Sequence, residues 1–347
     1  MTSTPLPPLS IERTTLPTIP WTELDAAPDR TICQTREWLN FLVETQGVEP
    51  VVARVLDGTE QVGWFTGAIA RRGPVRILGS PFRGWTTAAM GFNLEPGVPR
   101  SAALAALPAF AFKDLGCLHL EFADRGLLDE GDVPDGFHLA RLSGYELALV
   151  DDAGEPIDDD ALLGGMKSYG RRDVRRSLRN GIEVEVVDPA DPGSFAATYY
   201  AQVSEAFAKR DQRPTYPVER VEALIRHLGP TGRLLLLQSR TPDDGEVAAT
   251  GIFPGLPGST GEYWMGGSWR AKQPLLPNEA LMWTALRTWR DRGAVRFNFG
   301  GGGKYKAKYG GSPHSMPWVR RSRVEAVERL RAIAIDQYQR RRRGSSG

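Results

Sequence analysis

The stretch of this chain best suited to chemistry is FNFGGGGKYKAKYGG at 297–311, where four glycines lead into three lysines at alternate positions. Only seven of the 43 Lys and Arg residues are lysines, so this concentration exceeds the background composition. If 304–309 is extended, the lysines project to one side and the tyrosines to the other. One side could then bind phosphate or a developing oxyanion, and the alternative is a flexible loop followed by solvated lysines. These residues are Lys304, Lys306 and Lys308, with Tyr305 and Tyr309.

Standard phosphate-binding signatures do not match this stretch. A Walker loop requires Gly-x-x-x-x-Gly-Lys-Ser/Thr, so that backbone N–H groups surround the phosphates and the hydroxyl binds Mg²⁺. Asn298 stands at the first glycine of that pattern and Tyr305 at the hydroxyl position. The dinucleotide fingerprint fails too, because its third glycine is replaced by Tyr305 or Lys306, depending on the alignment. The stretch therefore excludes the two common nucleotide loops.

Length and composition indicate a globular protein of two ordinary domains or one large one. The chain has 347 residues, 41% hydrophobic and 24% charged, and a net charge of +1, so no DNA binding is expected from global charge. Cys33 and Cys117 lie far apart without metal-ligand spacing, so we expect no metal. The start MTSTPLPPLS lacks signal-peptide features, and no run of 18 apolar residues occurs. We therefore predict a cytoplasmic protein without a transmembrane segment.

The charge pattern changes abruptly in the middle of the chain. DDAGEPIDDD at 151–160 contains six acids, and KSYGRRDVRRSLRNG at 167–181 contains six bases and one acid. We predict an N-terminal domain at 1–150, an acidic linker at 151–166 and a C-terminal domain at 167–343.

Five arginines fall on one face of the predicted helix that follows this linker. That face could follow an RNA backbone, with a salt-dependent gain for each neutralised phosphate. The alternative is a solvated helix face balanced by the acidic linker. The five residues are Arg171, Arg172, Arg175, Arg176 and Arg179.

The order of elements in the second half indicates the fold class. Two helices (194–210 and 217–228) precede three strand-like runs, RLLLLQSR, EVAATGIFPG and TGEYWMGGS, and a helix at 277–293 precedes the strand AVRFNFG. This is the order of the N-acetyltransferase (GNAT) fold, and the first half could hold a reduced version. We predict an α/β (α+β) protein with tandem GNAT-like (acyl-CoA N-acyltransferase-type) domains and mixed central sheets.

Three stretches of the chain resemble the Fem-type (FemAB-like) aminoacyltransferases. They are KSYGRRDVRRSLRNGIEVEVV, LLPNEALMWTALRTWRDRGAVRFNFGG and YKAKYG, and the likeness covers roughly 160–312, with the first 150 residues similar by pattern only. The resemblance implies that an amine attacks the ester between an amino acid and its tRNA, which gives an amide. It implies aminoacyl-tRNA as co-substrate, no bound cofactor, and a small peptide or peptidoglycan-precursor-like acceptor. The inserted helical hairpin of longer members is missing.

Two other functions remain open. An acyl-CoA-dependent N-acyltransferase of the GNAT superfamily would use the same scaffold with CoA. The residues before the 277–293 helix, WRAKQPLLPNEAL, lack the Gln/Arg-x-x-Gly-x-Gly/Ala loop that holds the CoA pyrophosphate in such enzymes. A degenerate pair of domains could instead bind RNA or a partner without catalysis, although the intact YKAKYG argues against it.

The resemblance also implies roles for individual residues. Lys306 becomes the catalytic candidate, which stabilises the oxyanion or contacts the phosphate of the terminal adenosine. Lys304 and Lys308 would contact phosphates, with Tyr305 beside the substrate. Tyr263 lies in the strand where GNAT folds splay their sheet, and we expect it on the substrate side, with Trp264 in the core.

The remaining predictions concern loops and a general base. In KRDQRPTYP, Arg210 and Tyr216 would face the substrate, although Arg210 could instead form only an ion pair with Asp211 at the helix end. Arg83 and Trp85 in FRGW would line an acceptor pocket contributed by residues 1–150, or form only a turn. No carboxylate stands out as a general base. The two considered are Glu262 and Glu279.

Overall fold

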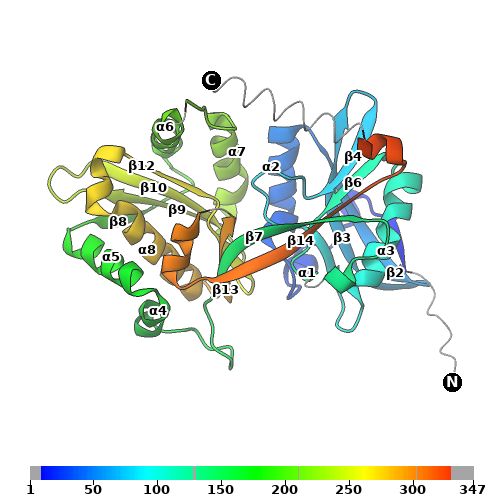
Figure 1. Ribbon diagram of the computed structural model, residues 1–347, viewed down its shortest axis with the longest axis horizontal. Coiled ribbons are helices and arrows are strands. Elements are labelled where there is room, and N and C mark those ends of the chain that lie inside the picture. The colour runs from blue at the N-terminus through cyan, green and yellow to red at the C-terminus, as the bar shows by residue number, and fades with distance from the viewer. Residues whose placement is uncertain (1–8, 128–129, 210, 302, 330–347) are drawn as a thin grey trace. The chain divides into compact units, whose positions relative to one another are not determined.

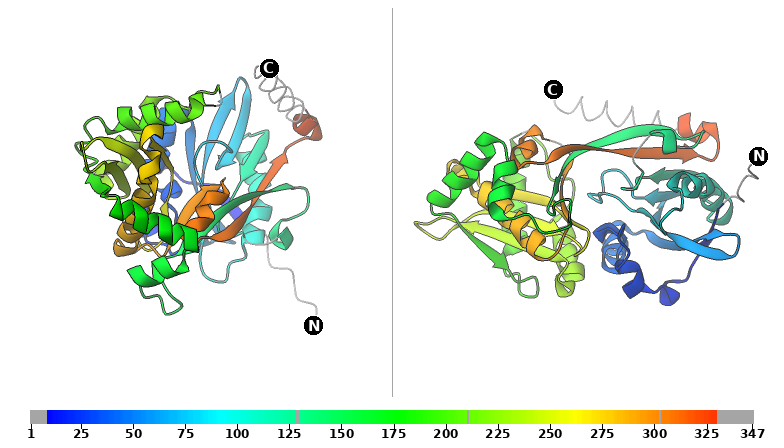
Figure 2. Two further views of the ribbon diagram at one scale, coloured as in Figure 1. Left: turned by 60° about the vertical axis from the view of Figure 1, so that its left-hand side comes forward. Right: turned by 90° about the horizontal axis from the view of Figure 1, so that it is seen from below.

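The computed structural model describes residues 9–127, 130–209, 211–301 and 303–329, with only the backbone at 130 and 304 (Figures 1 and 2). The chain divides into two compact units. The first contains the described residues up to Leu142 and those from Ser315 on, and the second is Ser143–His314. Strands β7 (His138–Ala148) and β14 (Ser312–Ser322) have residues in both. These bounds differ from those of the predicted domains, because β14 pairs with β6 of the first unit.

The first unit is built on a mixed sheet. Its strands follow the order β1-β2-β3-β4-β6, with β14 beside β6 and β5 beside β3. The β4–β6 pair is parallel, and the other pairs of this unit are antiparallel. The strands are β1 (Ser10–Arg13), β2 (Glu49–Asp57), β3 (Glu60–Arg72), β4 (Val75–Ser80), β5 (Gly91–Leu94) and β6 (His119–Phe122).

The helices of the first unit include α1 (Trp21–Asp25), α2 (Arg36–Gln46) and α3 (Arg100–Ala109). Helix α2 has a defined start and a defined end. The Thr35 hydroxyl accepts the N–H of Trp38, and Gly47 closes the helix with φ 63°, a conformation that glycine adopts without steric cost. Apolar side chains such as Phe65, Leu104 and Phe122 form the core between sheet and helices.

The second unit contains an antiparallel sheet of four strands in the order β12-β10-β9-β8. In Figure 1, α6 and α7 lie on one side of this sheet and α5 and α8 on the other. The strands are β8 (Glu183–Val187), β9 (Leu234–Arg240), β10 (Val247–Pro254) and β12 (Met265–Ser268). The helices are α4 (Asp159–Gly165), α5 (Ser168–Arg179), α6 (Phe195–Ala208), α7 (Val218–Leu228) and α8 (Pro277–Asp291).

A second set of strands completes this unit. Strand β13 (Arg296–Gly301) pairs antiparallel with β7 and parallel with β11 (Thr260–Glu262). The stretch TGEYWMGGS, predicted as one strand, is therefore divided between two partners: β11 pairs with β13, and β12 pairs with β10. Within the described residues, no helix has both the length and the apolar character that crossing a membrane requires.

Candidate active site

A pocket of about 230 Å³ opens in the second unit where its two sets of strands separate. Its walls come from β10, β12, the first turns of α8 and the turn at Lys304–Tyr309. The lining residues are Ala206, Thr250, Gly251, Phe253, Tyr263, Gly266, Gly267, Ser268, Gln273, Asn278, Glu279, Leu281, Met282, Tyr305 and Tyr309.

The separation of the strands falls between two consecutive residues. The N–H of Tyr263 donates to the Asn298 carbonyl of β13 (2.9 Å), and the N–H of Trp264 donates to the Ile252 carbonyl of β10 (3.1 Å). Tyr263 lines the pocket, and Trp264 is buried. A Cβ at Gly266 would lie 2.8 Å from the Tyr263 hydroxyl, so glycine at 266 leaves room for this ring.

The predicted extended conformation of residues 304–309 is wrong. The segment forms a 3₁₀ turn, in which the N–H of Lys306 donates to the Gly303 carbonyl (3.1 Å). Lysines and tyrosines consequently do not separate onto two faces. Lys306, Lys308 and Tyr309 are buried, whereas Tyr305 is 53% exposed. The Tyr309 ring stacks on Phe299, with 5.9 Å between the ring centres, and this anchors the turn to β13.

The Lys306 ammonium is held at the end of β13. Its Nζ donates to the carbonyl oxygens of Phe299 (2.5 Å) and Gly301 (2.7 Å) and lies 5.3 Å from the centre of the Tyr263 ring. Gly300 between these carbonyls has φ 70°. An ammonium has three donors, so one remains for a ligand oxygen after these two bonds. Burial lowers the pKa of Lys306 to about 8, so the amine is mainly protonated at neutral pH.

The Lys308 ammonium is paired inside the protein. Its Nζ lies 2.6 Å from Oε1 of Glu279 and 3.6 Å from Oδ2 of Asp173. Lys308 and Glu279 are both buried. The phosphate contact predicted for Lys308 assumed an extended segment with the three lysines on one side, and the 3₁₀ turn does not provide that arrangement. The side chain of Lys304 lies outside the described part of the structure.

The tyrosines of the pocket are neutral. Burial raises the pKa of Tyr263, and the interaction with Tyr305 raises it further. Burial also raises the pKa values of Tyr305 and Tyr309 above the usual value for a phenol. Among the lining residues, Glu279 is the one with a carboxyl side chain, and none is Lys, Arg or His.

The start of α8 closes one end of the pocket. Leu276 precedes the helix with φ 62°, its carbonyl accepts the Ser177 hydroxyl (2.7 Å), and Pro277 occupies the first helical position. The Asn278 amide donates to the Ser268 hydroxyl (3.0 Å). Sequence reasoning missed Ser268 and Asn278 as pocket residues. The sequence did contain a signal for them, since polar residues in the first turn of α8 follow shortly after the glycine pair 266–267.

Of the two loop residues predicted to face the substrate, the structure describes Tyr216 alone. Tyr216 is buried, its hydroxyl lies 2.6 Å from that of Tyr199, and its ring is 5.6 Å from Trp264. It does not line the pocket. Arg210 lies outside the described residues.

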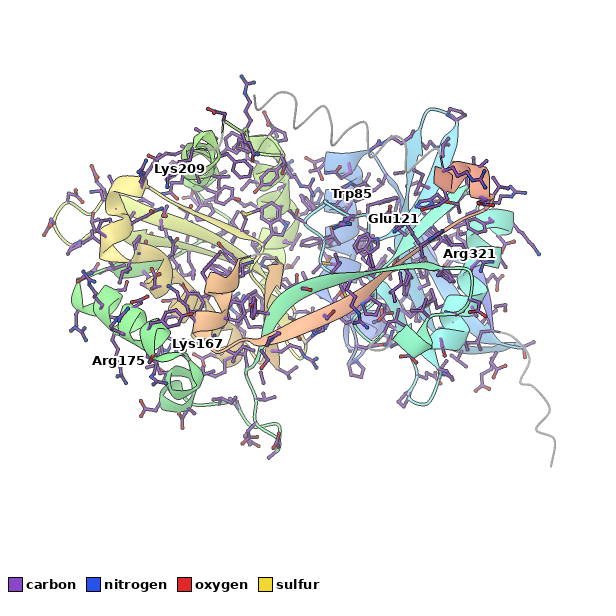
Figure 3. All side chains as sticks on the ribbon, viewed as in Figure 1. Trp85, Glu121, Lys167, Arg175, Lys209 and Arg321 are labelled. Atoms are coloured by element: carbon purple, nitrogen blue, oxygen red, sulfur yellow. The ribbon has the colours of Figure 1, made fainter. Side chains whose placement is uncertain are left out.

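The candidate acceptor residues lie in the first unit. Arg83 is exposed, and its backbone N–H donates to Oε2 of Glu121 (3.4 Å). Trp85 is half-buried against Phe82, with 4.3 Å between the ring centres. Figure 3 labels Trp85 and Glu121. Their assignment to an acceptor site stays a prediction.

The arginine face predicted after the linker lies on α5. Arg171 differs from the others, because its Nη1 donates to the carbonyls of Gly164 (2.6 Å) and Met166 (2.8 Å) and so holds the end of α4. Figure 3 shows Arg175 on the outer side of α5. The exposed members are Arg172, Arg175, Arg176 and Arg179.

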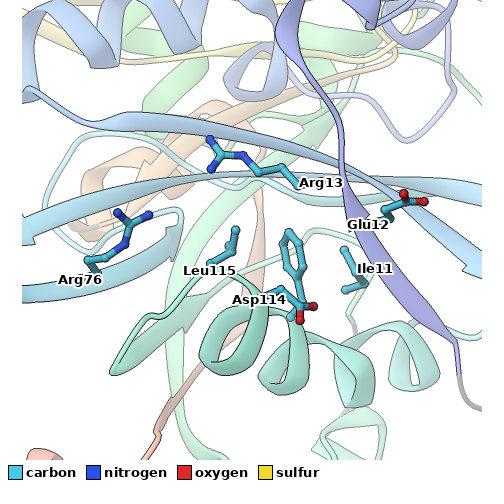
Figure 4. A pocket seen from close by; sticks show the side chains of 7 residues that line it. Ile11, Glu12, Arg13, Arg76, Asp114 and Leu115 are labelled. Carbon is cyan, nitrogen blue, oxygen red and sulfur yellow. The ribbon is translucent and has the colours of Figure 1, made fainter.

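A second pocket of about 230 Å³ lies in the first unit, between β1, β4 and the helical turn after α3 (Figure 4). Its two arginines, Arg13 and Arg76, are already paired with Glu49 at 2.8 and 3.4 Å. Among the described residues, no group of three or more His, Cys, Asp and Glu could hold a metal ion.

The order of elements and the split sheet are those of a GNAT fold. Residues 168–309 match the family model described as Acetyltransferase (GNAT) domain. The solved structure of FemX is similar, with a TM-score of 0.66 and 14% identity over 88% of this chain and 96% of FemX. The tandem GNAT fold that the sequence predicted is thus confirmed, and with it the Fem-type resemblance at the level of the fold.

Two further solved structures share this architecture. A tandem GNAT protein from the clavulanic acid biosynthesis pathway has a TM-score of 0.52 and 14% identity over 90% of this chain and 97% of its own. A domain assigned to a lysylphosphatidylglycerol synthetase from Agrobacterium fabrum has a TM-score of 0.50 and 13% identity over 78% of this chain and 85% of its own. The comparison with curated proteins gives no match.

Proposed function

We propose that this protein transfers an aminoacyl group from aminoacyl-tRNA to an amine of a small peptide or cell-wall-precursor-like acceptor. The observation that carries the proposal is the Lys306 ammonium, held 5.3 Å from the ring of Tyr263, which lines the pocket at the sheet separation. The FemX-like fold supports the same reaction class. Because aminoacyl-tRNA is a cytoplasmic molecule, the proposed reaction takes place in the cytoplasm.

The reaction needs a donor for a developing oxyanion. The acceptor amine attacks the ester carbonyl, an N–C bond forms, the C–O bond to the ribose breaks, and the ribose oxygen takes up a proton. Negative charge develops on the carbonyl oxygen, where the remaining N–H of Lys306 would donate. A preorganised donor of this kind lowers such a barrier by about 3 kcal/mol. Glu279 is engaged with Lys308, so the amine proton passes to water or substrate in this proposal.

The alternative donor is an acyl-CoA, which the GNAT family match favours. A pyrophosphate usually binds the free N–H groups at a helix N-terminus. In α8 the first position is Pro277, which has no N–H, and the N–H of Glu279 donates to the Leu276 carbonyl (3.2 Å). Glu279 also places a negative charge in the first turn, which satisfies the helix dipole without a ligand. These features favour aminoacyl-tRNA over CoA.

The test is turnover and binding with a mixed pool of charged tRNAs, measured beside acetyl-CoA as competitor. The proposal predicts preferential binding of charged over uncharged tRNA, transfer to an added amine acceptor, and loss of transfer in Lys306→Ala. Sequencing the tRNA that is discharged identifies the amino acid. Saturable CoA binding without any tRNA effect would assign the protein to the acyl-CoA class instead.

A further inference from the structure

We propose that this pocket recognises its acyl group through a positively charged amine, with Glu279 as the residue that selects it. The inference rests on the proposed function and deepens it, because it assigns donor selection to one side chain. An aminoacyl group would be accepted, whereas an acetyl or aliphatic acyl group of the same shape would be disfavoured.

The charge of the pocket walls carries the first step. The lining contains no lysine or arginine, and its one charged residue is Glu279. The three tyrosines keep their protons, because burial raises their pKa values. Glu279 is thus the one carboxylate that a ligand amine can meet in this partly desolvated space, where the pairing of opposite charges is stronger than in water.

The hydrogen bonding of Glu279 carries the second step. Oε1 accepts the Lys308 ammonium at 2.6 Å. Within the described part of the chain, Oε2 has no hydrogen-bond partner, although a carboxylate accepts several bonds. Glu279 lines the pocket and is 9% exposed. A ligand ammonium can therefore bind Oε2 while Lys308 keeps Oε1.

The aromatic rings carry the third step. Two of the three tyrosines of the pocket already contact ammonium groups of the protein: Lys306 Nζ lies 5.3 Å from the Tyr263 ring centre, and Lys308 Nζ lies 5.2 Å from that of Tyr309. Aromatic rings of this pocket are therefore suitable neighbours for an ammonium group. Tyr305, Tyr309 and Glu279 line the same pocket, so a ligand amine there contacts carboxylate and rings together.

The test uses two stable adenosine analogues that differ only in the amine. Both carry an amide at the 3′ position in place of the ester. One is acylated with alanine and the other with propionate, which is alanine without its amino group. Dissociation constants are measured by isothermal titration calorimetry. The wild-type protein is expected to bind the alanyl analogue about tenfold more tightly, the size of one charge-assisted hydrogen bond.

Three variants separate recognition from folding. Glu279→Gln and Lys308→Met each break the same buried ion pair, yet the first should abolish the preference for the alanyl analogue and the second should increase it. The double variant, which carries neither charge, should show no preference. A structural role for the pair would instead change both single variants in the same direction, which would overturn the assignment of Glu279.

Two further outcomes are decisive. Equal dissociation constants of the alanyl and propionyl analogues in the wild-type protein overturn the ammonium site and leave the proposed acyl transfer standing. Failure of both analogues to bind, with CoA bound instead, overturns the proposed function and with it this inference.

Discussion

Gly170 of α5 lies directly against the carbonyl oxygen of Lys308, so a Cβ at position 170 would overlap that oxygen. The same carbonyl accepts the backbone N–H of Lys167 (3.1 Å), immediately before α5 begins. The helix that carries the exposed arginines and the turn that carries the lysines are thus in direct backbone contact.

Gly170→Ala is therefore expected to destabilise the protein. Overpacking of this kind costs about 1–3 kcal/mol of unfolding free energy, because the turn or the helix must move. Denaturant unfolding measures the loss. Gly164→Ala is the matched control, since a Cβ at Gly164 in the neighbouring helix α4 meets nothing within 4 Å. Equal stability of the two variants would contradict the close contact.

Replacing the Lys306 ammonium should reduce turnover far more than folding. Lys306→Met keeps the side-chain length but removes the donor for the oxyanion, and we expect turnover to fall about 10²–10³-fold. Transfer from charged tRNA measures the loss, and circular dichroism and tRNA binding monitor fold and affinity. Lys209→Met, which removes an exposed lysine, is the control and should leave turnover unchanged. Unreduced transfer in Lys306→Met would remove this residue from the chemistry.

The pH dependence of turnover should show a falling limb near pH 8. Burial lowers the pKa of Lys306 to about 8, and the charged form is the one that donates to the oxyanion. The rate therefore declines as pH rises through 8. Rates under saturating charged tRNA, measured from pH 6 to 9 with a rapid assay that corrects for ester hydrolysis, test this. A rate that rises through pH 8 would indicate that the neutral amine acts as a base.

The same pKa shift makes a separate prediction for stability. The unfolded ammonium keeps its proton up to its ordinary pKa of 10.5, whereas the folded protein releases it near 8. Between these values the unfolded state binds more protons, so this group makes folding more favourable as pH rises. The unfolding free energy of the wild-type protein should therefore rise relative to Lys306→Met between pH 8 and 10. A constant difference would contradict the shift.

The exposed arginines of α5 should contribute to tRNA affinity through phosphates. Replacing Arg175, Arg176 and Arg179 by Gln should weaken binding and reduce the slope of log affinity against log salt by up to about one per arginine. Filter binding across a salt series measures both. Arg72→Gln removes an exposed arginine at the end of β3 and should change neither. An unchanged slope in the triple variant would show that these arginines do not contact tRNA phosphates and only form a solvated helix face.

Gly266→Ala should disturb Tyr263 and lower turnover. Its Cβ would lie 2.8 Å from the Tyr263 hydroxyl and 3.1 Å from the Thr250 carbonyl. Removing the hydroxyl relieves the first contact, so Gly266→Ala should cost less activity in a Tyr263→Phe background than in the wild type. Additive effects of the two substitutions, measured as a double-mutant cycle, would contradict this coupling.

The sequence predicts most of the elements because their signals are local. The arginine helix α5, helix α8 and the strands β9 and β10 are all present as expected. The prediction of an extended segment at 304–309 was wrong. Alternation of residue types indicates a strand only where one set of side chains faces solvent and the other faces the core. Here the Lys306 amine binds carbonyls of β13, and the Lys308 amine binds Glu279 of α8. Those acceptors belong to other elements, which local pattern does not reveal.

The candidate site was predicted only in part for a related reason. Tyr263 was placed beside the pocket by the order of elements, and Trp264 in the core, by alternation along a strand. The strands with which this segment pairs depend on which carbonyl accepts each backbone N–H. The amino-acid composition does not predict that pairing. In the sequence, Glu279 is recognisable only as an acidic residue in the first turn of a helix. Its place in the pocket, with Lys308 on one oxygen, follows from the packing of the turn against α8.

The change of partner between Tyr263 and Trp264 restricts how this segment can evolve. Successive side chains of a strand point to opposite faces, so a shift of one residue exchanges the two faces. Tyr263 and Trp264 are the two residues between β11 and β12, so a single deletion there removes one of them. One residue would then have to pair with both β13 and β10, or one of the two sheets would lose its strand. Substitutions can remodel the pocket at this point, but a change in chain length there alters both sheets together.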